Sequence, residues 1–406
     1  MEKFVINGNR RLSGEISVAG SKNAALPIIF SAITVYGITT LTNLPDISDV
    51  TVALEILSTL GAKIERGSDH AVIDTRSLTY NQVSERLTEK IRASTYLLGA
   101  MLVRFGRAEI GKFGGCNFEN RPIDMHVYAA CTLGAVLHEG VLFSERLYGG
   151  EIRFNKISVG ATVNALIMSA SAEGESKIYG YAKEPHVISL VEFLRSAGAE
   201  IEILDEYIRV KGARLSSARA EIIPDMIEAG TYMILSLITN SELKIKGADI
   251  SHLESFIMPL VNSGVVLEHY GDTLILSGAP EEPINVTTEP YPGFPTDLQP
   301  TLAPLLACFF GGTIKETVWH NRFGYLEELR KFGVKYELFD GYVRIEKSNI
   351  TPAEATAPDL RGGAALLLLA LFSDGESVLL KKDLIMRGYS DIIKKLRTIG
   401  AQIYDC

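Results

Sequence analysis

Hydrophobic and polar positions along the chain follow a pattern that recurs six times. In each copy a helix-like stretch ends in a small or apolar residue, a glycine, and then Ala or Val, and a strand-like stretch follows. The six glycines are Gly61, Gly134, Gly198, Gly264, Gly333 and Gly400. Successive glycines are 73, 64, 66, 69 and 67 residues apart, which indicates an internal repeat. A glycine at this position predicts a helix end with positive φ, a conformation that costs glycine little.

A second pattern lies between these glycines: a small or polar start, an apolar helix, a break and a strand. The six starts are Ser21–Asn23, Arg92–Ser94, Ser158–Gly160, Glu228–Gly230, Thr296–Leu298 and Asp359–Arg361. Helices such as 363–370 are apolar on every side, so we expect them to be buried on every side. A single doubly wound sheet with coincidental glycines is the alternative, and six near-equal spacings argue against it.

Six such units are too many for one core, so the pattern predicts two groups of three. The fold class is therefore α/β, with buried helices inside and sheets outside in each group. A helix N-terminus carries partial positive charge and free N–H groups. If several of these ends converge, even an acidic chain gains an anion site suited to a diphosphate or a phosphorylated acid.

Composition narrows the possible functions. The 406 residues carry a net charge of −9 without a long basic run, so we expect no nucleic-acid partner. The four cysteines form no CxxC pair and the seven histidines show no metal-ligand spacing, so we expect no required metal and no cofactor. Scattered cysteines favour a reducing compartment, and the strand-like start does not resemble a secretory leader. With no apolar run near 20 residues, we expect a cytoplasmic protein that does not enter a membrane.

The densest group of polar residues is the stretch 114–126, which contains Cys116. Two glycines precede the thiol, and Lys112 and Arg121 are near enough in sequence to lower its pKa. Such a thiol serves as an acid or a nucleophile, although a buried structural cysteine remains the alternative.

Other candidates have plain structural alternatives. Lys22, at a helix start, suits a phosphate or carboxylate, but a surface lysine explains it equally. Asp297 follows a rigid proline turn, where an N-cap role is common. Four further residues lie in short turns and could be solvated charges: Arg322, Asp359, Arg361 and Arg387.

Taken together, these residues resemble the enolpyruvyl transferase family over the whole chain. The marks that carry the resemblance are Ser21–Pro27, the Gly-Gly-Cys loop up to Asp124, Lys156–Thr162, Phe294–Asp297, Glu316–Phe323, Asp359–Arg361 and Arg387–Tyr389. The resemblance implies a two-domain inside-out α/β barrel of six βαβαββ repeats, three per domain. It places one domain at 22–223, inserted into a second formed by 1–21 and 224–406, with the active site in the cleft between them.

The resemblance is strongest to the branch of the family that acts on UDP-N-acetylglucosamine and phosphoenolpyruvate. It implies Cys116 as the general acid for C-3 of phosphoenolpyruvate and Asp297 as the base for the sugar 3-hydroxyl. Lys22, Arg121 and Arg387 would hold the phosphate and carboxylate. The residues implied to orient or bind the sugar nucleotide are Asn23, Arg92, Arg121, Pro122, Ile123, Asp124, Met125, Lys156, Ile157, Ser158, Val159 and Val318. Arg322, Asp359 and Arg361 would support the closed site.

The resemblance also implies that Cys116 is alkylated by the epoxide fosfomycin, whereas Cys131 and Cys308, in apolar helices, should be inert. Two alternatives stay open. One is a sister enzyme with 3-phosphoshikimate or a nucleoside as acceptor, although the shikimate enzyme lacks the cysteine loop. The other is a non-catalytic paralogue, which would be expected to have lost Cys116, Lys22, Asp297 or Arg387. We expect a monomer or a weak oligomer.

Overall fold

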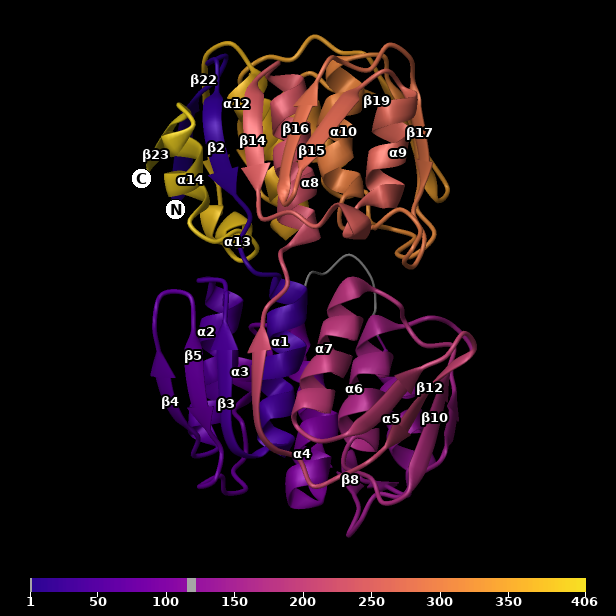
Figure 1. Cartoon of the computed structure of the whole chain (residues 1–406). Coiled ribbons are helices and arrows are strands. Elements are labelled where there is room, and N and C mark those ends of the chain that lie inside the picture. The colour runs from indigo at the N-terminus through magenta and orange to yellow at the C-terminus, as the bar shows by residue number, and fades with distance from the viewer. Residues whose placement is uncertain (1, 115–121) are drawn as a thin grey trace. The chain divides into compact units, whose positions relative to one another are not determined.

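Figure 1 shows a computed structural model of the chain, which describes residues 2–114 and 122–406. The described residues form two compact units. The first, here the 20–223 unit, runs from Gly20 to Ile223; the second, the 224–406 unit, also includes the residues up to Ala19. Among the described residues, the chain passes between the units at 19–20 and at 223–224, and each junction has a backbone hydrogen bond. Asp225 N donates to Ala19 O (2.9 Å) and Ser21 N donates to Ile223 O (2.7 Å).

The sequence repeat is a βαβαββ unit whose strands form one sheet. One complete copy consists of β17 (Ile284–Thr287), α10 (Gln299–Cys308), β18 (Gly312–Lys315), α11 (Leu326–Lys331), β19 (Lys335–Phe339) and β20 (Tyr342–Glu346). Another consists of β9 (Glu151–Arg153), α6 (Val159–Ser169), β10 (Glu175–Tyr179), α7 (Pro185–Ser196), β11 (Glu200–Ile203) and β12 (Tyr207–Lys211). In both, the first two strands are parallel and the others antiparallel.

Three further repeats are completed by segments that are distant in sequence. β1 (Lys3–Asn7) joins the repeat of β21 (Glu354–Thr356), α12 (Leu360–Phe372), β22 (Glu376–Leu380), α13 (Lys382–Met386), α14 (Ile392–Thr398) and β23 (Gln402–Asp405). β2 (Ser13–Ser17) joins that of α8 (Met226–Ile238), β14 (Glu242–Lys246), η3 (Ile250–His252), α9 (Glu254–Asn262), β15 (Val266–Tyr270) and β16 (Thr273–Ser277). β13 (Ser216–Glu221) joins that of α1 (Lys22–Ser31), η1 (Ala32–Thr34), β3 (Tyr36–Thr42), α2 (Ser48–Thr59), β4 (Lys63–Arg66) and β5 (Ala71–Asp74).

The remaining repeat lacks its first strand in the described part of the chain. It contains α3 (Glu85–Thr88), η2 (Arg92–Tyr96), α4 (Leu97–Phe105), β6 (Arg107–Glu109), α5 (Asp124–Thr132), β7 (Val136–His138) and β8 (Val141–Phe143). Its sheet has the order β6-β8-β7. Side chains of the preceding stretch reach β6: Tyr80 and Gln82 donate hydrogen bonds to Glu109 at 3.1 and 2.8 Å.

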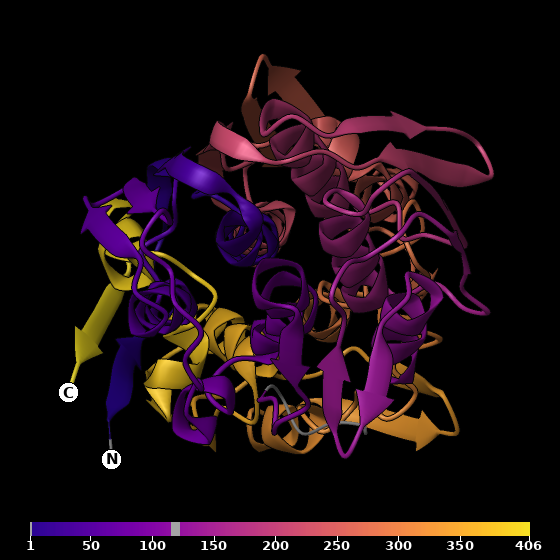
Figure 2. The same cartoon turned by 90° about the horizontal axis from the view of Figure 1, so that it is seen from below.

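The buried helices are those that the sequence predicts to be apolar on every side. They are α1, α4 and α6 in the 20–223 unit and α8, α10 and α12 in the 224–406 unit, with α8, α10 and α12 packed against one another. In α12 every residue from Leu360 to Leu371 is buried. The strands lie outside the helices, as the view of the 20–223 unit in Figure 2 shows. The α/β fold class with helices inside and sheets outside is confirmed.

The six repeat glycines end amphipathic helices as expected. Their φ values are +93°, +97°, +117°, +105°, +91° and +100° in sequence order. After α2, for example, Gly61 N donates to Ser58 O and Ala62 N donates to Leu57 O, which satisfies carbonyls at the helix end. Three of the buried helices start elsewhere than expected: α8 begins two residues before Glu228, α10 begins three residues after Thr296, and α4 begins at Leu97, after η2. No helix among residues 2–114 and 122–406 is long and apolar enough to cross a membrane.

Candidate active site

In the 20–223 unit the candidate residues gather where the buried helices begin (Figure 1). Lys22 is the first residue of α1, Arg92 opens η2, which leads into α4, and Val159 opens α6. Ser158 is the N-cap of α6 and its hydroxyl accepts a hydrogen bond from Ala161 N at 3.3 Å. The side chains therefore lie beside helix ends that favour anions.

Lys22 has an acidic neighbour. Its Nζ lies 3.9 Å from Oδ2 of Asp49, a buried residue in the first turn of α2. Lys22 and Asn23 remain partly exposed. Burial lowers the pKa of Arg92, which is also partly exposed. All three side chains are therefore accessible to solvent.

The candidates after the cysteine loop are mostly accessible. Ile123 is the N-cap residue of α5 and Asp124, the first residue of that helix, is exposed. Pro122 is exposed and Met125 is partly exposed, while Lys156 and Ile157 are exposed in the turn before α6. Cys116 and Arg121 lie outside the described residues.

His126 belongs to the same region, and the sequence reasoning did not select it. This histidine of α5 is buried beside Gly160, where an added Cβ would lie 3.2 Å from its Nε2. Its Nδ1 lies 2.7 Å from Nδ2 of Asn164. In the sequence, the one indication of its importance was its position at the end of the polar stretch 114–126. The spacing of the histidine from other residues matches no known motif.

The hydrogen bonds of Asn164 determine the tautomer of His126. Asn164 Oδ1 accepts from Gly99 N at 2.8 Å, so the other amide atom must be the donor. That Nδ2 donates to Thr95 O (3.0 Å) and to Nδ1 of His126. The proton of the neutral imidazole therefore lies on Nε2, facing the start of α6. Burial, with the charge of Arg92 as a second cause, lowers the pKa of His126 to about 4.

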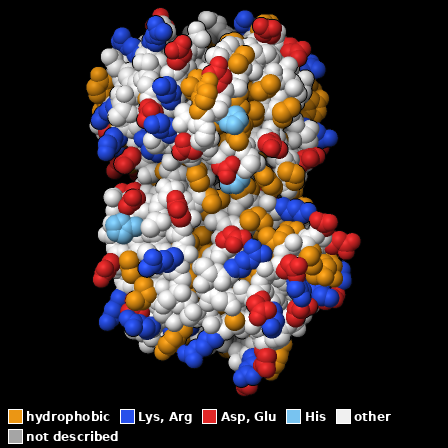
Figure 3. Space-filling model, in the orientation of Figure 1, with side chains coloured by type: hydrophobic (Ala, Val, Ile, Leu, Met, Phe, Trp, Pro, Cys, Tyr) orange, Lys and Arg blue, Asp and Glu red, His pale blue; other side chains and the backbone are white. Residues whose placement is uncertain are grey.

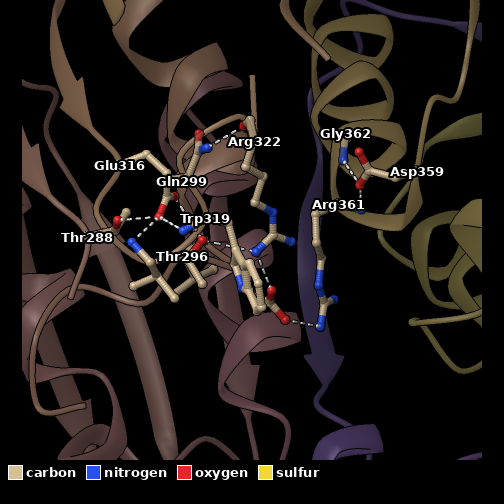
Figure 4. A network of polar contacts seen from close by, with 12 residues as sticks. Thr288, Thr296, Gln299, Glu316, Trp319, Arg322, Asp359, Arg361 and Gly362 are labelled. Atoms are coloured by element: carbon tan, nitrogen blue, oxygen red, sulfur yellow. Dashed lines mark hydrogen bonds and ion pairs between the residues drawn. The ribbon is translucent and has the colours of Figure 1, made fainter. Parts of the chain in front are cut away.

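In the 224–406 unit Asp297 forms ion pairs with two arginines, Arg322 and Arg361. Figure 4 shows the side chains of both arginines. Arg322 donates to Oδ1 of Asp297 at 2.7 Å, and Arg361 reaches Oδ2 at 3.4 Å. The Asp297 side chain is 29% exposed, whereas those of Arg322 and Arg361 are 6% and 1% exposed. Asp297 is not an N-cap, because Leu298 holds that position in α10. Its carboxylate is an accessible acceptor that two buried cations orient.

Glu316 connects the loops around Asp297, and the sequence reasoning gave it no role. It is buried, and its Oε1 accepts from Thr288 Oγ1 (2.7 Å), Val318 N (2.8 Å) and Trp319 N (2.9 Å). Its Oε2 accepts from Thr296 Oγ1 at 2.8 Å, and that hydroxyl accepts from Arg322 at 3.1 Å. Glu316 thereby holds Val318 and the residue before Asp297 (Figure 4). Its position beside Thr317-Val318 in the family motif was the only signal.

Asp359 has a structural role in α12. Its Oδ1 accepts from Arg361 N (2.8 Å) and Gly362 N (3.0 Å) as the N-cap. This cap fixes the backbone from which the Arg361 side chain extends. Nε and one terminal nitrogen of Arg361 have no hydrogen-bond partner among the described residues, and buried donors of this kind are usually satisfied. The guanidinium carbon also lies 5.5 Å from the ring centre of Tyr389.

The remaining candidates are Val318 and Arg387. Val318 is partly exposed, and its N–H donates to Glu316. Arg387 is the C-cap residue of α13 and partly exposed. No group of three His, Cys, Asp or Glu residues suited to a metal ion occurs in the described parts of the chain.

The structure corrects one expectation about the thiols. Cys131 is exposed on α5 rather than sheltered by an apolar helix. Cys308 is mostly buried, and burial raises the pKa of its thiol to about 12. The sequence pattern predicted the same burial for both cysteines, but Cys131 is exposed and Cys308 is mostly buried.

Known proteins that resemble the chain point to one family. The profile of EPSP synthase (3-phosphoshikimate 1-carboxyvinyltransferase) matches residues 6–396. The UDP-N-acetylglucosamine 1-carboxyvinyltransferase 3 of Caldanaerobacter subterraneus is 39% identical, over 99% of both chains. The UDP-N-acetylglucosamine 1-carboxyvinyltransferase of Halothermothrix orenii is 38% identical over the same shares.

Solved structures share the fold. The enolpyruvyl transferase NikO from Streptomyces tendae superposes with a TM-score of 0.89 at 25% identity, over 100% of this chain and 99% of the other. EPSP synthase from Acinetobacter baumannii superposes with a TM-score of 0.75 at 17% identity, over all of both chains. At 17% identity, the similarity to this EPSP synthase is evidence for the fold and not for the function.

Proposed function

The chain belongs to the EPSP synthase family of enolpyruvyl transferases, and on this premise we propose that it transfers the enolpyruvyl group of phosphoenolpyruvate to the 3-hydroxyl of UDP-N-acetylglucosamine. Phosphate is the second product. The product sugar nucleotide would enter peptidoglycan synthesis.

The choice of UDP-N-acetylglucosamine as the acceptor rests on one observation. The curated relatives that match the chain over 99% of its length at 35–39% identity are named for UDP-N-acetylglucosamine. The residues that the resemblance requires, including Lys22, Cys116, Asp297 and Arg387, are all present in the sequence. Loss of any of these four would have favoured a non-catalytic paralogue.

The proposed reaction has two steps. In the first, the sugar 3-hydroxyl adds to C-2 of phosphoenolpyruvate, the hydroxyl proton passes to a base, and C-3 receives a proton. In the second, the tetrahedral ketal loses phosphate from C-2 and a proton from C-3, and the enol ether forms. Cys116 is the proposed acid for C-3, and Asp297 is the proposed base.

The geometry around Asp297 suits a base. Arg322 donates to Oδ1 at 2.7 Å, and Arg361 contacts Oδ2 at 3.4 Å. The carboxylate, whose side chain is 29% exposed, is proposed to accept the proton of the sugar hydroxyl. The fixed orientation of the carboxylate would contribute to catalysis by positioning.

The anionic groups of phosphoenolpyruvate require cationic side chains to bind them. Lys22, Arg121 and Arg387 are proposed to hold the phosphate and carboxylate of phosphoenolpyruvate through charge-assisted hydrogen bonds. Arg361, two of whose buried nitrogens make no hydrogen bond with the described residues, is a further proposed contact for a ligand oxygen. Arg322 and Asp359 would act through the orientation of Asp297 and of α12.

The sugar nucleotide is assigned mainly to the 20–223 unit. Asn23, Arg92, the residues 121–125 and the residues 156–159 are proposed to bind it, together with Val318. The N-terminus of α6 offers free N–H groups next to Ser158 and Val159, which suits a diphosphate. The Nε2–H of His126 faces this helix start and is a further proposed donor or positioning group.

A panel of acceptors tests the proposal. Phosphate release from phosphoenolpyruvate should require UDP-N-acetylglucosamine and should not occur with 3-phosphoshikimate or a free nucleoside. Lys22→Ala should abolish turnover or raise the phosphoenolpyruvate requirement about ten-fold or more, because one charge-assisted contact is lost. Lys183→Ala, which changes a lysine outside the candidate site, is the matched control. Robust turnover with 3-phosphoshikimate would overturn the assignment. The cytoplasmic location and the monomeric or weakly oligomeric state stay predictions.

A further inference from the structure

A cavity of about 470 Å³ opens where the buried helices of the 20–223 unit end. It is lined by Thr34 after α1, by Arg104 in the last turn of α4 and by Ser171 after α6. The candidate active-site residues of this unit lie at the opposite, N-terminal ends of the same helices. The cavity is therefore separate from them within the unit.

The cavity concentrates positive charge in an acidic chain. Its ionisable lining, apart from Tyr36, consists of Arg104, Arg146, Arg214 and a single acid, Glu173. Elsewhere acidic and basic side chains are interspersed, as on the face shown in Figure 3. Arg146 pairs with Glu173 at 2.7 Å, but both side chains are mostly exposed and such pairs contribute little.

Two of the arginines share one aromatic ring. The guanidinium carbons of Arg104 and Arg214 each lie 5.0 Å from the ring centre of Tyr36. Arg104 is held in place because it donates to Thr75 O at 2.8 Å and contacts Val35 O at 3.5 Å.

Arg214 differs from most arginines of this unit. Its guanidinium makes no hydrogen bond or ion pair with another described residue, whereas Arg66, Arg76 and Arg153 each pair with a carboxylate. Burial lowers the pKa of Arg104, and the nearby charge of Arg214 lowers it further. The two like charges thus repel each other, and an anion between them would relieve that repulsion.

We propose that this cavity is a second anion site, which binds a phosphate-bearing small molecule through Arg104 and Arg214 beside Tyr36. The planar guanidinium group matches phosphate oxygens with paired donors, and Arg214 has its donors available. The volume suits a small ligand. This site does not depend on the proposed enzymatic function.

Titration calorimetry of the full chain with pyrophosphate tests the proposal. Arg214→Ala should weaken binding to the cavity about ten-fold or more, since a charge-assisted contact is lost. Arg219→Ala removes an exposed arginine of the adjacent β13 that does not line the cavity, and should leave binding unchanged. Binding to the cavity should persist in Arg387→Ala, which removes a cation proposed for the catalytic anion site.

Two results would overturn the second site. One is pyrophosphate binding that is equal in the wild type and in Arg214→Ala. The other is binding that disappears entirely in Arg387→Ala, which would place all of it at the catalytic site. Because the Arg214 side chain makes no hydrogen bond in the described structure, its loss should not unfold the protein. Unchanged turnover of Arg214→Ala without pyrophosphate checks this point.

Discussion

Arg322 donates a 2.7 Å hydrogen bond to Oδ1 of Asp297, and this bond orients the carboxylate. The donor is buried, and its backbone carbonyl is held in turn by Gln299 at 2.8 Å. The guanidinium therefore has little freedom to follow a carboxylate that rotates. Orientation of the proposed base depends on Arg322 more than on the longer contact with Arg361.

We expect Arg322→Ala to lower kcat/KM for the transfer reaction about ten-fold or more, because a hydrogen bond to a charged group contributes about 1.5–3 kcal/mol. Steady-state kinetics would show the loss mainly in kcat, since Arg322 is not assigned to substrate binding directly. Arg330→Ala, which breaks an exposed pair with Glu327, is the control and should be near normal. Equal kinetics in both variants would contradict the positioning role.

Glu316 offers a second test of how the site is supported. Glu316→Ala would leave four donors without their acceptor, two of them backbone N–H groups. Each unsatisfied buried group costs about 1–3 kcal/mol, so the free energy of unfolding should fall. The KM for UDP-N-acetylglucosamine should rise as well, because Val318 loses its support.

Glu316→Gln distinguishes the role of Glu316 in positioning Asp297 from its contribution to stability. It keeps one acceptor oxygen for the backbone N–H groups but places an amide against Thr296, so it should fold well and still show reduced kcat. Glu327→Ala, an exposed change, is the control. A fully active Glu316→Gln enzyme would mean that the hydrogen bond from Thr296 does not affect Asp297.

The repeat made the fold predictable from the sequence. Glycine is favoured at positive φ, so Gly61 and its five equivalents marked helix ends that the structure reproduces. The apolar 363–370 stretch likewise had to be buried because it has no polar face. It was harder to predict which distant strand completes each repeat. β2, for example, pairs with β14, which lies more than 200 positions later in the sequence.

Individual site residues were less predictable than the fold. A lone Asp297 or Arg361 looks the same in sequence whether it is a solvated charge or part of a buried ion pair; only packing distinguishes them. Glu316 and His126 were overlooked because their importance lies in hydrogen bonds to backbone groups and to Asn164, which have no sequence spacing of their own. Cys131 was misjudged because one helix contains both buried and exposed positions.

His126 should make the stability of the protein depend on pH. Its pKa falls from 6.5 to about 4 in the folded state, so between these values the unfolded chain binds a proton that the folded chain does not. Acidification through this window therefore favours unfolding, by up to about 3 kcal/mol. This contribution is absent above about pH 6.5, where His126 is neutral in both states.

Urea titrations between pH 4 and 7 (about the range where histidine titrates) would measure this slope. His126→Gln should reduce the dependence of the unfolding free energy on pH, whereas His138→Gln, an exposed change in β7, should not. Parallel slopes for wild type and His126→Gln would show that the pKa of His126 is the same in the folded and unfolded chains. Nitrogen chemical shifts should also report a proton on Nε2 near neutral pH.

Alkylation by fosfomycin tests the assignment of Cys116, which rests on the family resemblance and on the cations near it in sequence. Thiolates attack epoxides, so a cysteine of lowered pKa should react first. Cys116→Ser should escape the inhibitor and lose most of its turnover while still binding the sugar nucleotide. Cys308 should stay unmodified, because burial raises its thiol pKa to about 12.

The exposed cysteines require a site-resolved readout. Cys131 and Cys406 are accessible to general thiol reagents, so total labelling would not identify the reactive group. Peptide mass mapping after brief exposure to fosfomycin should find the adduct on the peptide that contains Cys116. Cys131→Ser is the matched control, and it should keep both turnover and sensitivity to the inhibitor. An adduct on Cys131 alone, or an active wild type that resists the epoxide, would exclude Cys116 as the reactive acid.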